Sequence, residues 1–204
     1  MDLRQRRRAE TQRAIQSHAL RLFVERGYDS TTVADVAHAA GVSPMTLYRH
    51  FPTKEDLVLT DQYDRLIAEQ IAATPAAGSL VHRIGSTLVQ VARIAVGSGA
   101  DTAADASANL SDEGFLDRVR LMISTPALRA RHWDSQFATQ KAIVDAVCDD
   151  PADPDLEFRA WVAAAACLAA MNVALMRWAE QDGGPDLPAL IADALSAAFA
   201  DEFA

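Results

Sequence analysis

Hydrophobic residues recur three and four positions apart along almost the whole chain, and no segment alternates with the period of two that is typical of a strand. Breaks rich in Gly, Pro, Ser and Asp separate the runs. The pattern therefore predicts an all-α chain. The predicted helices cover residues 9–26, two short helices within 31–51, and then residues 53–73, 80–96, 101–109, 112–124, 126–148, 155–181 and 187–203.

The segment of residues 31–51, TTVADVAHAAGVSPMTLYRHF, predicts two short helices joined by a tight turn. Thr32 is a suitable N-cap, and Asp35 three positions later completes a capping box at the positive end of the helix dipole. Gly41 can end this helix, because glycine adopts the left-handed conformation at little cost. This layout is that of a helix-turn-helix DNA-binding motif.

The second of these short helices has the composition of a helix that reads a DNA groove. Ser43 followed by Pro44 is a start signal, since proline favours the first position of a helix. Leu47 and Phe51, four positions apart, form the inward pair and are assigned to the core. The remaining side chains, Met45 among them, point outward and form a short face that is mainly polar and mildly basic.

Residues 41–57 read G-V-S-x-x-T-L-Y-R-H-F-x-x-K-x-x-L, and this run resembles the DNA-binding signature of the TetR family of bacterial transcriptional repressors. The resemblance spans about residues 9–61, with Gly27 and Tyr28 at the end of the first helix. It implies an N-terminal three-helix, helix-turn-helix DNA-binding domain followed by an antiparallel helical ligand-binding and dimerisation domain. We expect the DNA-binding domain in residues 1–54, a connecting helix and linker in residues 55–79, and the second domain in residues 80–204.

The candidate DNA contacts follow from the chemistry of the outward positions. Arg49 can bond bidentately to the edge of a guanine, or it can bind a phosphate. Pro44 and Met45 have no donor, so they can recognise only a thymine methyl group or the shape of the groove. Tyr48 either donates to a phosphate or lies half-buried at the rim. The predicted DNA-binding set is Thr32, Ser43, Pro44, Met45, Thr46, Tyr48, Arg49, His50 and Lys54.

Charge is divided unevenly between the two parts of the chain. The net charge is −9, but residues 1–54 contain nine Lys or Arg against five Asp or Glu, whereas residues 55–204 contain ten against twenty-three. Local potential controls the approach to phosphates, so the predicted DNA-binding domain is the basic part. Four arginines near the N-terminus form either an arm that reaches a minor groove or phosphates, or a source of diffuse attraction only. They are Arg4, Arg6, Arg7 and Arg8.

The last two predicted helices combine small residues, which permit close approach of a neighbouring helix, with large apolar ones. In the TetR family the corresponding pair packs against its copy. The resemblance therefore implies a homodimer on a pseudo-palindromic operator, whose half-sites lie about one helical turn, roughly 34–36 Å, apart. Alternatively, both helices only close their own domain. The predicted dimer contacts are Ala164, Leu168, Leu175, Ile191 and Leu195.

The resemblance also implies a small-molecule effector that releases the operator. Bulky apolar residues occur on the helices that surround the cavity in relatives, and ligand sites usually have apolar linings with few polar groups. We expect a small apolar or amphipathic effector. Asn172 lies in an apolar helix and needs a partner, either a ligand or a backbone carbonyl. The predicted lining is Phe115, Met122, Trp133, Phe137, Trp161, Met171 and Asn172.

Other functions find less support in the sequence. Two cysteines, Cys148 and Cys167, indicate a reducing compartment such as the cytoplasm, and they also allow a redox-responsive regulator if they are not buried and inert. A small helical enzyme is the competing class, but the five histidines are dispersed and no nucleophile elbow, phosphate loop or CxxC motif occurs. We therefore expect no catalytic residue, no metal site and no cofactor.

Residues 160–176 contain no charged side chain, but they are few for a bilayer and include Asn172. A buried helix explains this segment better than a membrane span.

Overall fold

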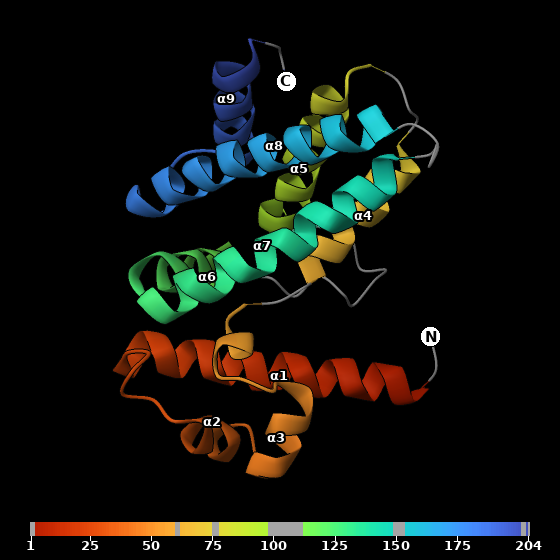
Figure 1. The fold of residues 1–204 in the computed structure, drawn as a ribbon. Helices are drawn as coiled ribbons and strands as arrows, with labels where there is room; N and C mark the ends of the chain where they lie inside the picture. Colours follow the sequence, from red (N-terminus) through yellow and green to blue (C-terminus); the bar gives the residue numbers. More distant parts are fainter. Residues whose placement is uncertain are drawn as a thin grey trace. The chain divides into compact units, whose positions relative to one another are not determined.

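Helices make up all the regular structure in the described part of the chain, which comprises residues 3–59, 62–74, 78–97, 112–148, 154–200 and 203 of a computed structural model. This confirms the predicted all-α class (Figure 1). The helices are α1 (Leu3–Arg26), α2 (Val33–Ala39), α3 (Pro44–His50), the 3-10 turn η1 (Glu55–Leu57), α4 (Gln62–Ala73), α5 (Leu80–Gly97), α6 (Asp112–Ser124), α7 (Pro126–Val147), α8 (Pro154–Glu180) and α9 (Leu187–Phe199). The predicted helix at residues 101–109 lies outside the described residues.

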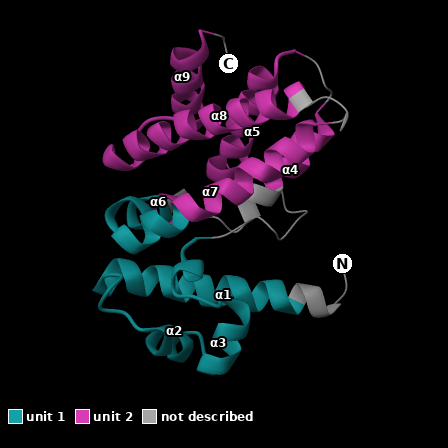
Figure 2. Ribbon diagram, in the orientation of Figure 1, with its two compact units in different colours: residues 1–60, 117–132 teal, residues 61–116, 133–204 magenta. Residues whose placement is uncertain are grey.

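The chain divides into two compact units, coloured separately in Figure 2. Unit 1 consists of Met1–Thr60 together with Asp117–His132, and unit 2 consists of Asp61–Leu116 together with Trp133–Ala204. Helices α6 and α7 therefore each contribute residues to both units. The turn between these two helices belongs to unit 1, although more than fifty residues of sequence separate it from the rest of that unit.

The core of unit 1 forms between α1, the two short helices and the segment that follows them. The first helix presents Ile15, Ala19, Leu22 and Phe23 at helical spacing, and these four residues are at most 3% exposed. Leu128, at the start of α7, is fully buried in the same cluster. The cluster contains Ile15, Ala19, Leu22, Phe23, Tyr28, Val36, Ala37, Leu47, Phe51, Leu57, Val58 and Leu128.

The single helix predicted over residues 53–73 is wrong, because two elements occupy this span. Thr53 and Asp56 form a reciprocal capping pair: the Thr53 amide donates to the Asp56 carboxylate over 2.9 Å, and the Asp56 amide donates to the Thr53 hydroxyl over 3.3 Å. Only the 3-10 turn η1 follows, and both Leu57 and Val58 are buried in the core of unit 1. The local capping pair therefore starts a turn here, but core burial decides how far the helix continues.

The C-terminal helix α9 ends at Phe199, four residues earlier than predicted. Ala200 takes a left-handed conformation with φ 53°, and its amide donates to the Ser196 carbonyl. The chain then brings Phe203 onto α5, where a Cβ added to Gly85 would lie 2.5 Å from the Phe203 ring. Glycine at position 85 therefore allows the close approach of an aromatic ring to the helix backbone.

In unit 2, α9 packs on both α5 and α8, and α5 also packs on α8 and α4. Arg83 of α5 is only 7% exposed, and its guanidinium donates to the Ile71 carbonyl over 3.0 Å and to the Ala146 carbonyl over 3.5 Å. Both carbonyls lie near the C-terminal ends of their helices, α4 and α7. The negative ends of two helix dipoles thus stabilise this buried cation.

By length and composition, α8 is the one helix among the described residues that is long and apolar enough to cross a membrane. Helices in the core of a globular domain meet the same criterion, and one side of α8 packs on α5 and α9.

Candidate nucleic-acid interface

The helix-turn-helix geometry follows closely from the local sequence signals. The predicted capping box is present, since the Asp35 amide donates to the Thr32 hydroxyl over 3.1 Å and the Thr32 amide donates to the Asp35 carboxylate over 2.8 Å. These hydrogen bonds to Thr32 lower the pKa of the Asp35 carboxyl. Gly41 has φ 66° and turns the chain between α2 and α3.

Helix α3 begins as predicted, with Ser43 as its N-cap and Pro44 at the first helical position. The Thr46 amide donates to the Ser43 hydroxyl over 3.1 Å, and the two side-chain hydroxyls are 2.9 Å apart in a hydrogen bond. Leu47 is fully buried and Phe51 is 6% exposed, which confirms the predicted inward pair. The helix is therefore held by a cap at its start and by core packing along its inner side.

The outer side of α3 brings three of the predicted DNA-binding residues together. Met45 is 80% exposed, Tyr48 is 49% exposed and Arg49 is also exposed. Spacings of three and four residues put these side chains on one face of the helix. Pro44 is exposed beside them, whereas Thr46 is half-buried. This face offers an aromatic hydroxyl, a guanidinium and a thioether to a partner.

His50 lies at the last turn of α3 and is half-buried. Burial lowers its pKa, and the nearby positive charges of Arg8 and Arg49 lower it further. Its Nδ1 atom is buried and has no hydrogen-bond partner among the described residues. The imidazole is therefore neutral at pH 7 and can donate one hydrogen bond.

We expect unit 1 to become less stable as the pH is lowered, because of His50. The lowered pKa means that the unfolded chain binds a proton near pH 6.5 while the folded chain does not. The contribution of His50 to the free energy of unfolding should therefore be constant above about pH 7, and it should decrease as the pH falls through 6.5 toward the lower folded-state pKa. Urea denaturation of the wild type and of His50→Gln between pH 5 and 8 checks this. Equal pH dependence in the two proteins would contradict it.

Lys54 makes contacts within unit 1 that the sequence did not indicate. Its ammonium donates to the Tyr28 carbonyl over 2.5 Å and lies 4.1 Å from the centre of the Tyr28 ring. The Tyr28 hydroxyl in turn donates to Glu55 over 3.1 Å. Lys54 thus stabilises the end of α1 through a charged hydrogen bond and a cation–π contact. A phosphate contact from its remaining donors stays a prediction.

The N-terminal arginines lie within α1, which begins at Leu3 and not at residue 9 as predicted, and their contact with DNA stays a prediction. The backbone of α1 is helical from Leu3, because arginine is a good helix former and the helical run continues through these residues. The side chains of Arg4 and Arg6 lie outside the described part of the structure. Arg8 is close enough to His50 to affect its pKa, so this end of α1 lies near the end of α3.

The residues of the predicted ligand lining lie in different surroundings in the structure, and their contact with an effector stays a prediction. Trp133 and Phe137 are 62% and 66% exposed on α7, and Phe137 stacks on Trp161 with ring centroids 5.3 Å apart. These two side chains are therefore on the surface of a single chain and not in its core. Both faces of α7 carry apolar residues, so periodicity could not identify the inner one. Met122 belongs to unit 1, and the other six residues belong to unit 2. Phe115 packs against Trp178. Both Trp161 and Met171 are half-buried, and Asn172 is 8% exposed.

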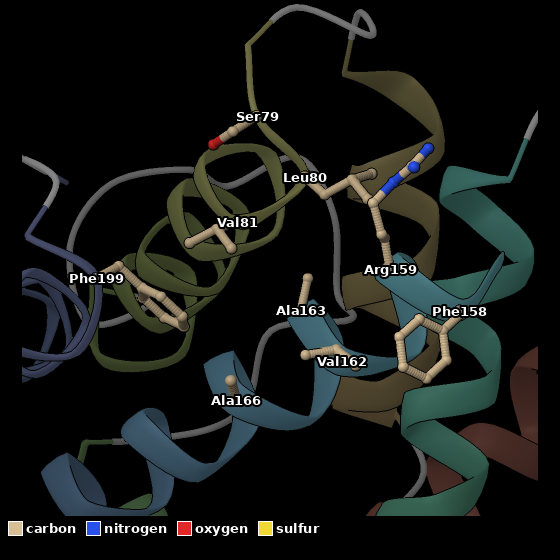
Figure 3. Close-up of a pocket in the computed structure, with 9 residues that line it drawn as sticks. All are labelled: Ser79, Leu80, Val81, Phe158, Arg159, Val162, Ala163, Ala166 and Phe199. Atoms are coloured by element: carbon tan, nitrogen blue, oxygen red, sulfur yellow. The ribbon is translucent and has the colours of Figure 1, made fainter. Parts of the chain in front are cut away.

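A groove in unit 2 has a volume of about 410 Å³ and walls that are almost wholly apolar (Figure 3). It is formed by the start of α5, the first half of α8 and the end of α9. None of its residues was in the predicted ligand lining, whose members lie on α6, α7 and α8. The groove is lined by Ser79, Leu80, Val81, Phe158, Arg159, Val162, Ala163, Ala166 and Phe199.

The five predicted dimer contacts are at most 9% exposed within a single chain, so they cannot form a contact surface with a second copy. Ala164, Leu168, Leu175, Ile191 and Leu195 pack instead in the core of unit 2. Helix α8 is apolar on all sides, and for that reason its sequence did not show which side faces inward. Its exposed side is a stripe that we call the α8 stripe. The α8 stripe consists of Phe158, Val162, Ala165, Ala169, Val173 and Met176.

Comparison with protein families gives two matches that together cover most of the chain. Residues 15–60 match the model of bacterial regulatory proteins of the tetR family, and residues 87–201 match the model of the MftR C-terminal domain. The second match alone covers more than half of the chain.

Two curated relatives are similar over shorter stretches. The HTH-type transcriptional regulator TcmR of Streptomyces glaucescens is 45% identical over 58 residues, which are 28% of this chain and 26% of that protein. The HTH-type transcriptional repressor KstR2 of Rhodococcus jostii is 52% identical over 40 residues, which are 20% of each protein. The chain thus matches only about a quarter or less of the length of these relatives.

Solved structures share the fold over nearly the whole chain. The fatty acid degradation regulator FadR of Bacillus halodurans superposes with a TM-score of 0.57 at 17% identity, covering 91% of this chain and 93% of that one. The transcriptional regulator FadR of Bacillus subtilis, solved in complex with stearoyl-CoA, superposes with a TM-score of 0.55 at 15% identity, covering 93% and 98%. At these identities the likeness shows the fold alone.

Proposed function

Because the chain belongs to the TetR family of bacterial transcriptional regulators, which are not enzymes, we propose that it is a ligand-responsive repressor that binds a pseudo-palindromic operator as a homodimer. The observation that carries the proposal is the capped helix α3, whose inner side is fixed in the core and whose outer side exposes Met45, Tyr48 and Arg49. A rigid helix with exposed, chemically diverse side chains suits recognition of base edges in the major groove. Unit 1 also carries the basic part of the sequence.

In this proposal α3 enters the major groove and the residues around it bind phosphates. Arg49 is the candidate for guanine recognition, and Tyr48 and His50 are candidates for donors to phosphate oxygens. Thr32 and Ser43 act first as helix caps. Their positions at the starts of α2 and α3 would also bring backbone amides toward phosphates.

Replacement of Arg49 by Ala is expected to remove base preference at one position of each half-site. The reason is that base contacts specify the sequence, whereas phosphate contacts only position the protein. A bidentate contact to guanine is worth about 1–3 kcal/mol of discrimination. Competition binding with operators that vary at each position measures this loss. If the Arg49→Ala variant lost affinity equally for operator and scrambled DNA, Arg49 would instead be assigned to a phosphate contact.

The homodimer is proposed to form through the α8 stripe. Its six residues follow one another in steps of four, three, four, four and three, which keeps them on one face of a straight helix. The stripe is symmetric about a point near Cys167, with small residues in the middle and large ones at both ends. A two-fold axis there would pair Phe158 with Met176 of the partner subunit and would allow close approach at the alanines. Self-complementarity of this kind is what a two-fold interface requires.

The effector is proposed to be a small apolar or amphipathic molecule bound by unit 2. Two observations support this chemistry: unit 2 has an apolar groove of about 410 Å³, and a structural neighbour was solved with stearoyl-CoA, an amphipathic molecule. The effector must bind the DNA-competent and the released forms with different affinity, because otherwise no population shift follows.

The corner between α6 and α7 is proposed to carry the effector signal to the DNA-binding helices. Leu128 is fully buried among core residues of α1, α2 and α3. The Arg131 guanidinium also lies 3.5 Å from the Asp56 carboxylate. A displacement of α6 or α7 would therefore act directly on the packing of unit 1.

A redox-responsive regulator is less well supported than an effector-responsive one. Cys167 is fully buried, and burial raises the pKa of its thiol to about 12. The thiolate is the reactive form, so this cysteine is unreactive in the folded chain at neutral pH. We therefore propose that Cys167 is a structural thiol and that the protein is cytoplasmic.

Selection of bound DNA from a random pool tests the proposed function. We expect enrichment of an inverted repeat whose half-sites lie about one helical turn, roughly 34–36 Å, apart. The complex with this operator should then be dissociated by an amphipathic compound, found by screening acyl-CoA molecules and other apolar compounds. Recovery of no common sequence would contradict sequence-specific DNA binding.

A further inference from the structure

Met45 is the most exposed large apolar side chain among the described residues, at 80%, and it lies at the second position of α3. An apolar side chain so fully exposed to water has much surface to gain by contact with an apolar group. It does not belong to an extended apolar surface, because its exposed neighbours on α3 are Pro44, Tyr48 and Arg49.

The polar groups next to Met45 are already used within the helix cap. The hydroxyls of Ser43 and Thr46 bond to each other over 2.9 Å, and the Thr46 amide donates to Ser43 over 3.1 Å. Pro44 has no amide hydrogen. The first turn of α3 therefore presents a mainly apolar tip formed by Pro44 and Met45.

Only one group on the major-groove edges of the four base pairs is apolar, and it is the C5 methyl group of thymine. We propose that Met45 recognises a thymine methyl group in each half-site of the operator. This inference rests on the proposed DNA binding and specifies one feature of the sequence bound. The unbranched, polarizable side chain of methionine adapts its shape readily to such a contact.

The position of Arg49 restricts where this thymine lies. Arg49 follows Met45 by four residues, which is about 6 Å along the helix axis at 1.5 Å per residue. Base pairs are stacked about 3.4 Å apart. The thymine should therefore lie within about two base pairs of the base that Arg49 contacts, on the same half-site.

Uracil provides the direct test, because it lacks the C5 methyl group and otherwise keeps the hydrogen-bonding edge of thymine. The operator recovered by random-pool selection is synthesised with each thymine replaced in turn by uracil. At one position per half-site we expect about fourfold weaker binding, the value of one buried methyl-sized group. Met45→Ala should bind the thymine operator as weakly as the wild type binds the uracil operator. Replacing thymine by uracil should not weaken the binding of Met45→Ala any further.

Two control variants make the result specific. Met45→Leu keeps an apolar side chain and should retain the preference for thymine over uracil. Val24→Ala removes apolar surface from another exposed residue of unit 1, 52% exposed on α1, and should leave the preference unchanged. Equal melting temperatures for the Met45 variants and the wild type establish that the fold is intact, as expected for an exposed position.

The inference would be overturned if no thymine were sensitive to uracil replacement, or if Met45→Ala kept the full sensitivity of the wild type. Failure of the selection to enrich any sequence is a different result. That outcome would contradict the proposed DNA-binding function itself, and the thymine contact with it.

Discussion

Ala165→Glu is expected to convert the proposed dimer into a folded monomer. Ala165 lies in the middle of the α8 stripe and is exposed within a single chain, so its replacement leaves the core of unit 2 intact. In the proposed dimer it faces Ala169 of the partner subunit, and two symmetry-related carboxylates would be buried without partners. Each unpaired buried charge costs several kcal/mol, which exceeds what a small apolar interface can offset.

Operator affinity should fall at least 100-fold when the dimer is lost, because a monomer contacts one half-site only. Light scattering gives the mass, and circular dichroism establishes the helical content. Ala138→Glu, at an exposed position of α7 outside the stripe, is the matched control and should stay dimeric. A dimeric, folded Ala165→Glu protein would put the interface elsewhere. A charge at Leu168 could not make this distinction, since that residue is 3% exposed and its replacement would unfold the chain.

Replacement of Leu128 by Ala is expected to destabilise unit 1 by about 2–5 kcal/mol, the usual cost of truncating a fully buried leucine. Leu128 is 0% exposed and lies in the same cluster as Ile15, Leu47 and Leu57. The variant should also respond weakly to effector, because the corner between α6 and α7 would no longer be packed tightly into the DNA-binding helices. Hydrogen exchange of the α1–α3 amides measures the local stability.

Arg131→Ala is the control for Leu128→Ala, since it changes the same corner without opening a cavity. The Arg131–Asp56 pair is 3.5 Å long and partly exposed, and pairs near the surface contribute about 0–1 kcal/mol. If Leu128→Ala lowered the free energy of unfolding of unit 1 by less than about 1 kcal/mol, the corner would not be part of the core of unit 1.

Sequence patterns predicted the helix-turn-helix segment in detail because its signals are local. The capping box of Thr32 and Asp35, the left-handed Gly41 and the Ser43 cap each depend on contacts within three or four residues. These signals specify backbone geometry whatever the surrounding fold is.

Predictions failed where the answer depends on distant residues or on the choice between two apolar faces. Helices α7 and α8 carry apolar residues on several sides, so the inner face is decided by packing and not by periodicity. For this reason Trp133 and Phe137 were assigned inward and Leu168 outward, whereas the structure has the reverse. Likewise, no local signal places Leu128 in the core of unit 1 or the Lys54 ammonium on Tyr28.

The central claim, that one dimer binds two half-sites through its two α3 helices, is tested most directly by the spacing between those half-sites. Five base pairs inserted at the centre of the selected operator turn one half-site by half a helical turn, because a turn contains about 10–10.5 base pairs. Binding measured by fluorescence anisotropy should then fall at least 100-fold, to the affinity of a single half-site. Unchanged affinity after the insertion would contradict the account.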